Sequence, residues 1–200
     1  LIDEIWEDRP VLSEEPAFNL DVKYAGETVA SKLARIREEM KEAGTNVHVV
    51  STIDDICWTL NIRGNDIDFF PLVLSYGIIT MYSFELYIDE KKLDDKLKAK
   101  LEKDGVNLHP YNDIYEDVKK FGSDVVAMID PGKLNYALFN NIPENVKTVE
   151  KRNPAILMKA IKNPVEIENI RKAQIKDSVA HVRFMKWLKE NVGKETITEM

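Results

Sequence analysis

The 200-residue chain predicts an α/β fold, a β-sheet flanked by helices and followed by a long C-terminal helix. Three observations carry this prediction. Short β-branched runs alternate with segments of helical period, as in α/β proteins. Val125–Ile129 is a run of five apolar residues, typical of a strand covered on both faces. Asn163-Pro164-Val165-Glu166 combines a cap, a proline and a glutamate, the strongest helix start in the chain.

The individual elements follow from local patterns. Apolar residues at helical spacing predict a helix over Thr28–Ala43, which Gly44 ends. Further helices are expected over Glu90–Lys103, after Asn112, and after the cap and proline at Asp130-Pro131. The predicted strands are Val47–Ser51, Leu72–Tyr82, Phe84–Ile88, Val106–His109, Val125–Ile129, Val146–Val149 and Ile156–Ala160.

The helix that begins at Thr52 organises the middle of the chain. Thr52 and Asp55 have the spacing of a capping box, and an apolar stripe runs to Leu60. Gly64 can adopt the left-handed conformation that ends a helix. Arg63 would then lie at the helix C-terminus, where the helix dipole favours a positive charge.

The C-terminal helix runs from Pro164 to about Asn191, with Gly193 beyond it. Its apolar residues occupy more than one stripe, so it should require cover on two sides. We therefore expect a protein of this length to self-associate through the helix, or to lose order after about Lys176.

Composition narrows the function. A net charge of −7 and an isoelectric point of about 5.1 argue against nucleic-acid binding. No apolar run long enough for a membrane span and no signal peptide is visible, so a cytoplasmic protein is expected. The single cysteine, Cys57, reads as a buried small hydrophobe. His48, His109 and His181 are not spaced as metal ligands, and we expect structural or solvated roles for them.

Five ordered segments resemble the long, three-domain form of Xaa-Pro aminopeptidases. They are Asp3–Pro10 ("IWxDRP"), Lys23–Glu27 ("YAGES"), Asp55–Tyr76 ("NLRG…SY"), Lys159–Glu166 ("KAIKNPVE") and Arg171–Asp177 ("RKAHIRD"). Two positions depart from the family pattern: Phe70 replaces an Asn and Gln174 replaces a His. The resemblance implies a mixed sheet of the creatinase/prolidase N-terminal type.

The resemblance also implies a division of the chain. Residues 1–24 would connect to a preceding domain, 25–160 would form the middle domain, and 161–200 would begin the catalytic domain. Because the chain starts without Met and stops early in an apparent helix start at Thr198, we expect a segment of a longer protein.

In this family two metal ions, held by two Asp, one His and two Glu, activate a water that attacks the bond before proline. All five ligands would lie after Met200. The resemblance therefore implies no catalytic residue and no cofactor in this chain, which would be inactive alone, and two divalent ions, expected to be manganese, in the whole protein. Its partners would be the rest of the catalytic domain and a peptide with proline second; a homodimer is left open, and nucleic acid and membrane are not expected.

Arg63 is the one candidate substrate-binding residue. On the first reading it caps a helix and pairs with Asp66 or Asp68. On the second, the Asn61–Gly64 loop faces the catalytic cleft and the guanidinium binds a substrate carboxylate or carbonyl. The alternative to the aminopeptidase is a non-enzymatic module on the same fold that binds peptides or histones, or part of a prolidase or creatinase.

Overall fold

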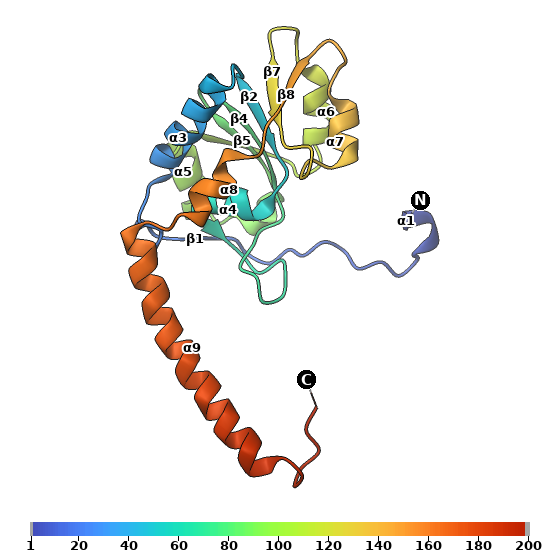
Figure 1. Ribbon diagram of the computed structural model, residues 1–200. Coiled ribbons are helices and arrows are strands. Elements are labelled where there is room, and N and C mark those ends of the chain that lie inside the picture. The colour runs from blue at the N-terminus through green and yellow to red at the C-terminus, as the bar shows by residue number, and fades with distance from the viewer. Residues whose placement is uncertain (1, 199–200) are drawn as a thin grey trace.

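Figure 1 shows the computed structural model of the chain, which describes residues 2–198. Within these residues six strands form one sheet in the order β6-β5-β4-β2-β7-β8. The strands are β2 (Val47–Val50), β4 (Tyr76–Thr80), β5 (Phe84–Tyr87), β6 (Val106–His109), β7 (Val126–Ile129) and β8 (Lys147–Glu150). Residue 1 of the expected connector and residues 199 and 200 of the expected C-terminal segment lie outside the described residues.

The sheet is mixed. Strand β4 runs antiparallel to both β2 and β5, whereas the pairs β5–β6, β2–β7 and β7–β8 are parallel. The predicted sheet with flanking helices is therefore confirmed, and the strands expected over Leu72–Tyr82 and Phe84–Ile88 pair as the hairpin β4–β5. The parallel pairs place the carboxyl ends of β5 and β6 at one shared edge, and likewise those of β2 and β7.

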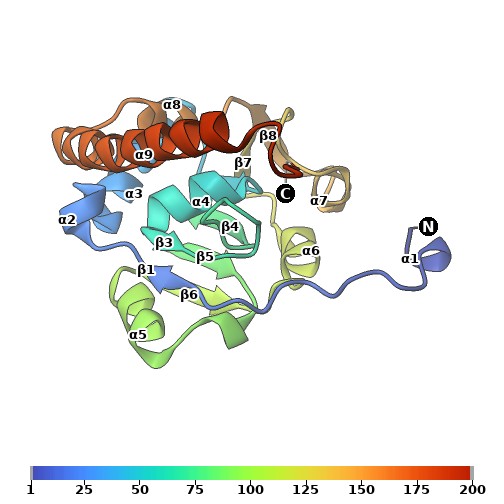
Figure 2. The same ribbon diagram turned by 90° about the horizontal axis from the view of Figure 1, so that it is seen from below.

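Helices cover both faces of the sheet, as Figures 1 and 2 show. A larger apolar core lies under α3, α4, α5 and α8, and a smaller one under α6 and α7. These helices are α3 (Val29–Glu42), α4 (Ile53–Leu60), α5 (Asp95–Lys103), α6 (Ile114–Asp117), α7 (Tyr136–Asn141) and α8 (Pro154–Ala160).

The N-terminal stretch crosses the body as an extended segment (Figure 2). It begins with the short helix α1 (Ile2–Ile5) and includes β1 (Phe18–Asn19), which pairs antiparallel with β3 (Ile62–Arg63). Helix α2 (Val22–Ala25) follows. The end of the expected connector thus contributes regular structure to the body.

The strand expected over Leu72–Tyr82 is shorter in the structure, where β4 covers only Tyr76–Thr80. Polar side chains take the backbone amides that a neighbouring strand would otherwise bind. Leu74 N donates to Asp66 Oδ2 at 2.7 Å, and Val73 N donates to Cys57 Sγ at 3.4 Å. The segment is therefore held by the preceding loop and does not join the ladder.

The strand expected over Ile156–Ala160 is wrong: these residues belong to α8. Asn153 Oδ1 accepts Ala155 N at 3.0 Å, and Pro154 occupies the first turn. The start of α8 thus has the same Asn-Pro signature as the long helix, and this cap, not the apolar run, decides the conformation.

Three predicted helices begin at other residues. The helix expected after Asp130 starts at Tyr136, because the Asp130 carboxylate accepts Gly132 N and Asn153 N, and Asn135 provides the cap.

The helix expected over Glu90–Lys103 is split, since Asp94 caps α5 through Leu97 N. Its first part is the 3-10 turn η1 (Glu90–Lys92). The N-cap of α6 is Asp113, one residue beyond Asn112, and a second 3-10 turn, η2 (Val118–Lys120), ends it.

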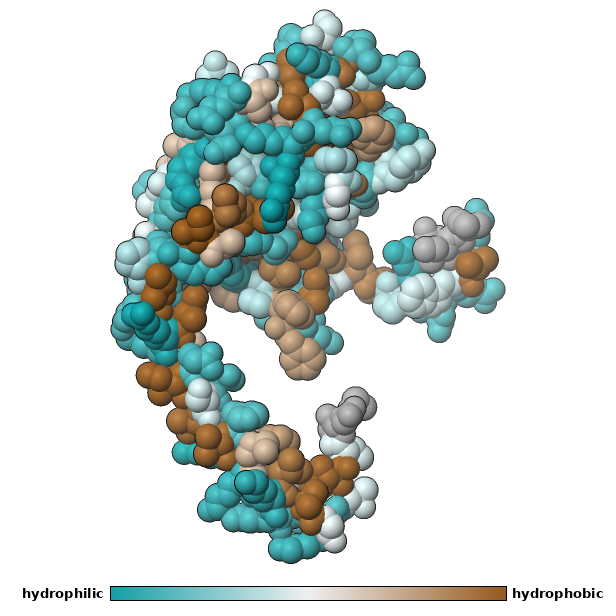
Figure 3. All heavy atoms as spheres, viewed as in Figure 1, coloured by the Kyte–Doolittle hydropathy of each residue, from teal (hydrophilic) through white to brown (hydrophobic). Residues whose placement is uncertain are grey.

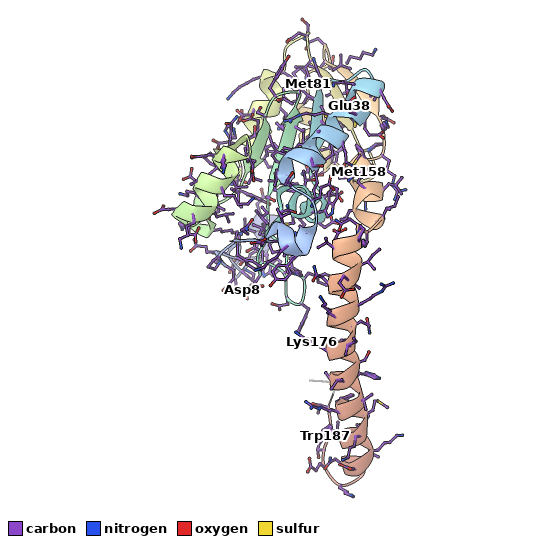
Figure 4. The ribbon with its side chains drawn as sticks, turned by 90° about the vertical axis from the view of Figure 1, so that its left-hand side faces the viewer. Asp8, Glu38, Met81, Met158, Lys176 and Trp187 are labelled. Atoms are coloured by element: carbon purple, nitrogen blue, oxygen red, sulfur yellow. The ribbon has the colours of Figure 1, made fainter. Side chains whose placement is uncertain are left out.

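The long helix α9 (Pro164–Asn191) is present, and its capping box between Asn163 and Glu166 is formed. It is 28 residues long, or about 42 Å. None of its residues is buried, and it extends away from the body as Figure 4 shows, with Lys176 and Trp187 far from the sheet. Within residues 2–198 no helix combines the length and apolarity needed to cross a membrane.

The start of α9 contacts α2. Asn163 Nδ2 donates to Ala25 O at 2.8 Å, and Asn169 Nδ2 donates to Lys23 O at 3.3 Å. Gly26 ends α2 with φ of 71°, and a Cβ at this position would lie 2.2 Å from Asn163 Oδ1. Glycine is therefore required at residue 26 both for its conformation and for the approach of α9.

Gly26→Ala should destabilise the protein more than Gly44→Ala. Both residues have positive φ, but a Cβ at Gly44 meets nothing within 4 Å. Each variant should lose about 1–2 kcal/mol for the left-handed conformation. Gly26→Ala should lose about a further 1–3 kcal/mol from the clash. Urea unfolding measures both, and equal losses would show that the contact with Asn163 does not constrain α9.

Candidate functional site

The candidate site is the loop Asn61–Asp66, which follows α4. Helix α4 ends at Asn61, whose φ of 52° and ψ of 40° are left-handed, and not at Gly64 as expected. Asparagine tolerates this conformation better than most residues. Gly64 has a different role, since a Cβ there would lie 2.6 Å from Val73 Cγ2. The loop therefore begins at Asn61 as predicted, and only the residue in the left-handed conformation differs, three positions before Gly64.

A buried lysine holds the first end of the loop. Lys32, on α3, is 1% exposed, and its Nζ donates to Trp58 O and to Asn61 Oδ1, both at 2.7 Å. Its ammonium also lies 4.3 Å from the centre of the Trp58 ring, a cation–π contact. Burial lowers the pKa of Lys32 to about 8, and Glu166 and Glu27 oppose this shift.

A second buried lysine holds the other end. Lys92 Nζ donates to Asp66 Oδ2 at 2.5 Å, and the two side chains are 2% and 0% exposed. Leu74 N donates to the same oxygen at 2.7 Å. Breaking a buried pair of this kind typically costs about 3–5 kcal/mol, because the remaining charge is left unpaired. The loop is thus held at both ends.

Arg63 lies between these two ends and is half-buried. Its Nη1 donates to Cys57 O and Ile62 O, both at 2.8 Å, so the side chain does cap the last turn of α4. The expected ion pair does not form among the described residues, because Lys92 binds Asp66. Capping is therefore confirmed, and the pairing with Asp66 or Asp68 is wrong.

The rest of the Arg63 guanidinium is free to bind. Both hydrogen bonds use Nη1, whereas Nε and Nη2 have no partner within residues 2–198 and are not fully buried. Burial lowers the pKa of Arg63, but an arginine remains charged. The Nε–Nη2 edge has the geometry that binds a carboxylate or a polarised carbonyl through two hydrogen bonds.

Neither lysine was recognised from the sequence. Lys32 follows Val29 by three residues and precedes Ile36 by four, so it lies on the apolar stripe of its helix. That position was a usable signal of a buried charge. Lys92 lies in the highly charged segment Glu90–Lys103, a pattern typical of a solvated helix face. Nothing in its local sequence distinguishes it from the exposed lysines of that segment.

The paired acids at the start of α4 form a different network. Thr52 Oγ1 donates to Asp55 Oδ2 at 2.6 Å, so the expected capping box does not form. The buried Asp55 also accepts Asn153 Nδ2 at 2.9 Å and Lys159 Nζ at 2.7 Å, and Lys159 pairs with Asp54 as well. This network ties α4 to α8.

The histidines lie outside the candidate site. His48 is fully buried, its ring nitrogens lie within hydrogen-bond distance of Met128 O and Asn153 Oδ1, and burial lowers its pKa. His109 stacks on Tyr87 and contacts Glu85. His181 is exposed on α9. Among the described residues no three His, Cys, Asp or Glu side chains are grouped to hold a metal ion.

The remaining single residues are readily placed. Cys57 is buried as predicted, and burial raises its pKa. Of the two departures from the family pattern, Phe70 is 62% exposed beyond the candidate loop, and Gln174 is exposed on α9 beside Ser178.

Lys32 should give the protein a distinctive pH dependence. Its pKa is about 8 when folded and near 10.5 when exposed. Between these two pH values the unfolded state binds more protons than the folded state. The free energy of unfolding of the wild type should therefore increase with pH relative to that of Lys32→Met. Below the lower pKa the difference should be constant. Urea unfolding from about pH 7 to 10 measures it.

The exposed Lys41 on the same helix supplies the control, and Lys41→Met should run parallel to wild type across this range. A difference between wild type and Lys32→Met that does not change with pH would contradict a buried ammonium at Asn61.

Comparison with known proteins identifies the family. The family model described as the creatinase/prolidase N-terminal domain matches residues 8–166. An Xaa-Pro aminopeptidase of Dictyostelium discoideum is 38% identical over 95% of this chain, and a probable Xaa-Pro aminopeptidase P of Neurospora crassa is 35% identical over 96%. The chain spans 30% of the length of each of these relatives.

Solved structures agree in fold. An X-prolyl aminopeptidase of Caenorhabditis elegans, described as a cytosolic enzyme with a di-nuclear active site, superposes with a TM-score of 0.89 at 34% identity; the match covers 95% of this chain and 32% of that one. An Xaa-Pro dipeptidase of Bacillus anthracis, 16% identical with a TM-score of 0.55, shares the fold. The chain belongs to the creatinase/prolidase N-terminal domain family.

Proposed function

We propose that the whole protein is a cytoplasmic Xaa-Pro aminopeptidase, and that this chain walls its substrate cleft without taking part in the chemistry. The similarity over 95% of the chain to an enzyme of that kind supports this. The proposed parts are a connector (1–24), a middle domain (25–160) and the first helix of the catalytic domain (161–200). Two divalent metal ions, manganese in our proposal, would be held elsewhere in the whole protein, since the described residues offer no ligand group.

The observation that carries the proposal is the free edge of Arg63. Its Nη1 donates to two carbonyl oxygens at the end of α4, and these two hydrogen bonds do not use Nε or Nη2. The loop is held by Lys32 and by Lys92, so the guanidinium is preorganised and loses little entropy on binding. We propose that it binds the carboxylate or a carbonyl of a peptide whose second residue is proline.

The proposed neighbour of α9 is the rest of the catalytic domain. The helix carries apolar side chains along its exposed length, and Figure 3 shows them as a brown run below the body. The more exposed ones are Ile170, Ile175, Val179, Val182, Phe184 and Trp187. An unpaired surface of this kind is typical of a protein interface.

This chain alone should therefore self-associate through α9. Replacing Ile175 and Val182, which are 67% and 66% exposed, with Glu should shift sedimentation toward monomer, because the charges would be buried in the contact. Val11→Glu is the control, since Val11 is 92% exposed on the N-terminal segment. A chain that stays monomeric at high concentration would show that the apolar surface of α9 does not require burial by another protein surface.

Arg63→Ala in the full-length enzyme should lower kcat/KM about 30- to 1000-fold, equivalent to about 2–4 kcal/mol of transition-state binding. The melting temperature should fall by only a few degrees, because Arg63 loses two hydrogen bonds while Cys57 O still accepts the Asn61 amide. Activity on an Xaa-Pro peptide and thermal unfolding are measured together.

Arg35→Ala is the matched control. Arg35 is an exposed arginine that pairs with Glu27 at 2.8 Å, so its loss should change neither quantity appreciably. If Arg63→Ala keeps activity within about threefold of wild type, or simply unfolds, Arg63 is only a helix cap.

A further inference from the structure

A cavity of about 480 Å³ lies at the edge of the sheet where β5 and β6 end. Ile88 and Asp89 follow β5, and Pro110 and Tyr111 follow β6, so the lining comes from the carboxyl ends of two adjacent parallel strands. Ligands of α/β proteins bind outside the carboxyl ends of strands. The cavity also has the volume of a small-molecule site.

The walls are largely apolar. Leu12 of the N-terminal segment, Leu74 and Ile88 contribute aliphatic surface, and Tyr111 contributes an aromatic ring. The ring lies 5.1 Å from that of Tyr76, which orients it. Burial raises the pKa of Tyr111, so its phenol is neutral at physiological pH. The cavity therefore suits an apolar or aromatic body.

The charged groups of the lining favour a cation. Asp89, Glu90 and Asp113 line the cavity together with Lys92, whose ammonium is bound to Asp66. Glu90 also pairs with Lys98 at 3.4 Å, but its side chain stays 57% exposed. Asp113 begins α6 without capping it through its side chain, so its carboxylate is not committed to the helix.

Behind the wall, Asp66 neutralises Lys92. One of its oxygens accepts Lys92 Nζ and Leu74 N, both from residues of the lining. The other, Oδ1, is buried without a partner among the described residues. With Lys92 neutralised, the carboxylates of Asp89, Glu90 and Asp113 give the lining more negative than positive charge.

We propose that this cavity binds a small organic cation, an ammonium or guanidinium group carried on an apolar or aromatic body. The cationic group lies against Asp113 and Glu90, and the body packs on Leu74, Ile88 and the Tyr111 ring. The cation also gains from the face of that ring. The site is separate from the Arg63 edge, which binds an anionic or carbonyl oxygen, and it does not depend on the proposed peptidase function.

Three probes of the same shape test the charge requirement. Phenethylamine, 2-phenylethanol and 3-phenylpropionate present a cation, a neutral group and an anion on one ring. Titrations of the whole chain, followed by amide NMR shifts, should place phenethylamine at the residues after β5 and β6. The amine should bind at least about tenfold more tightly than the propionate. Equal binding of the three probes, no binding of the amine, or shifts elsewhere would overturn the proposal.

Variants test the residues. Asp113→Asn combined with Glu90→Gln should weaken phenethylamine binding about three- to tenfold and leave 2-phenylethanol unchanged. Asp177→Asn removes one exposed carboxylate on α9, outside the cavity, and should change neither. Because all three acids are exposed and the substitutions are isosteric, the variants should fold, which circular dichroism checks. An unchanged amine affinity in the double variant would show that its carboxylates do not hold the cation.

Discussion

The six-residue loop that presents Arg63 depends on two ammonium groups taken out of water. Lys32 binds its first residue and Lys92 its last. Burying a charge costs several kcal/mol, so each lysine is acceptable only because good acceptors surround it. Lys32 has a carbonyl, an amide oxygen and an indole face, and Lys92 has a carboxylate. In return the loop has one conformation, which is what a binding residue on a loop requires.

The junction with α9 shares this electrostatic environment. Glu166, in the first turn of the helix, closes the capping box with Asn163 and opposes the lowering of the pKa values of Lys32 and Arg63 by burial. Asn163 packs against Gly26, so the helix start is held by sterics and by hydrogen bonds at once. The first turn of α9 therefore lies within electrostatic reach of Lys32 and Arg63, the residues that hold and form the candidate site.

Local signals decided most of the elements, and several of the misreadings share one cause. The capping box at Asn163 is formed, whereas the Thr52 hydroxyl donates to the Asp55 carboxylate and does not cap its helix. Asp130 and Asp66 likewise bind amides far along the chain or in a neighbouring loop. A polar side chain has a few possible partners nearby and many at long range. For the two aspartates a partner farther along the chain displaced the local one, because a buried polar group must be satisfied. For Thr52 the competing partner is local, the Asp55 carboxylate three residues on.

The sequence by itself determined the fold class, the long capped helix, and the family, because periodicity, caps and ordered motifs are local or collinear properties. It also placed Arg63 next to the end of a helix. Only the tertiary structure decided that Asn61 ends α4, that Lys32 and Lys92 are buried at the loop, and that Asp66 is unavailable to Arg63. Each of these rests on contacts between residues 26 to 29 positions apart. Charge pairing at that separation depends on packing, and only the burial of Lys32 has a local signal, its position on the apolar stripe of α3.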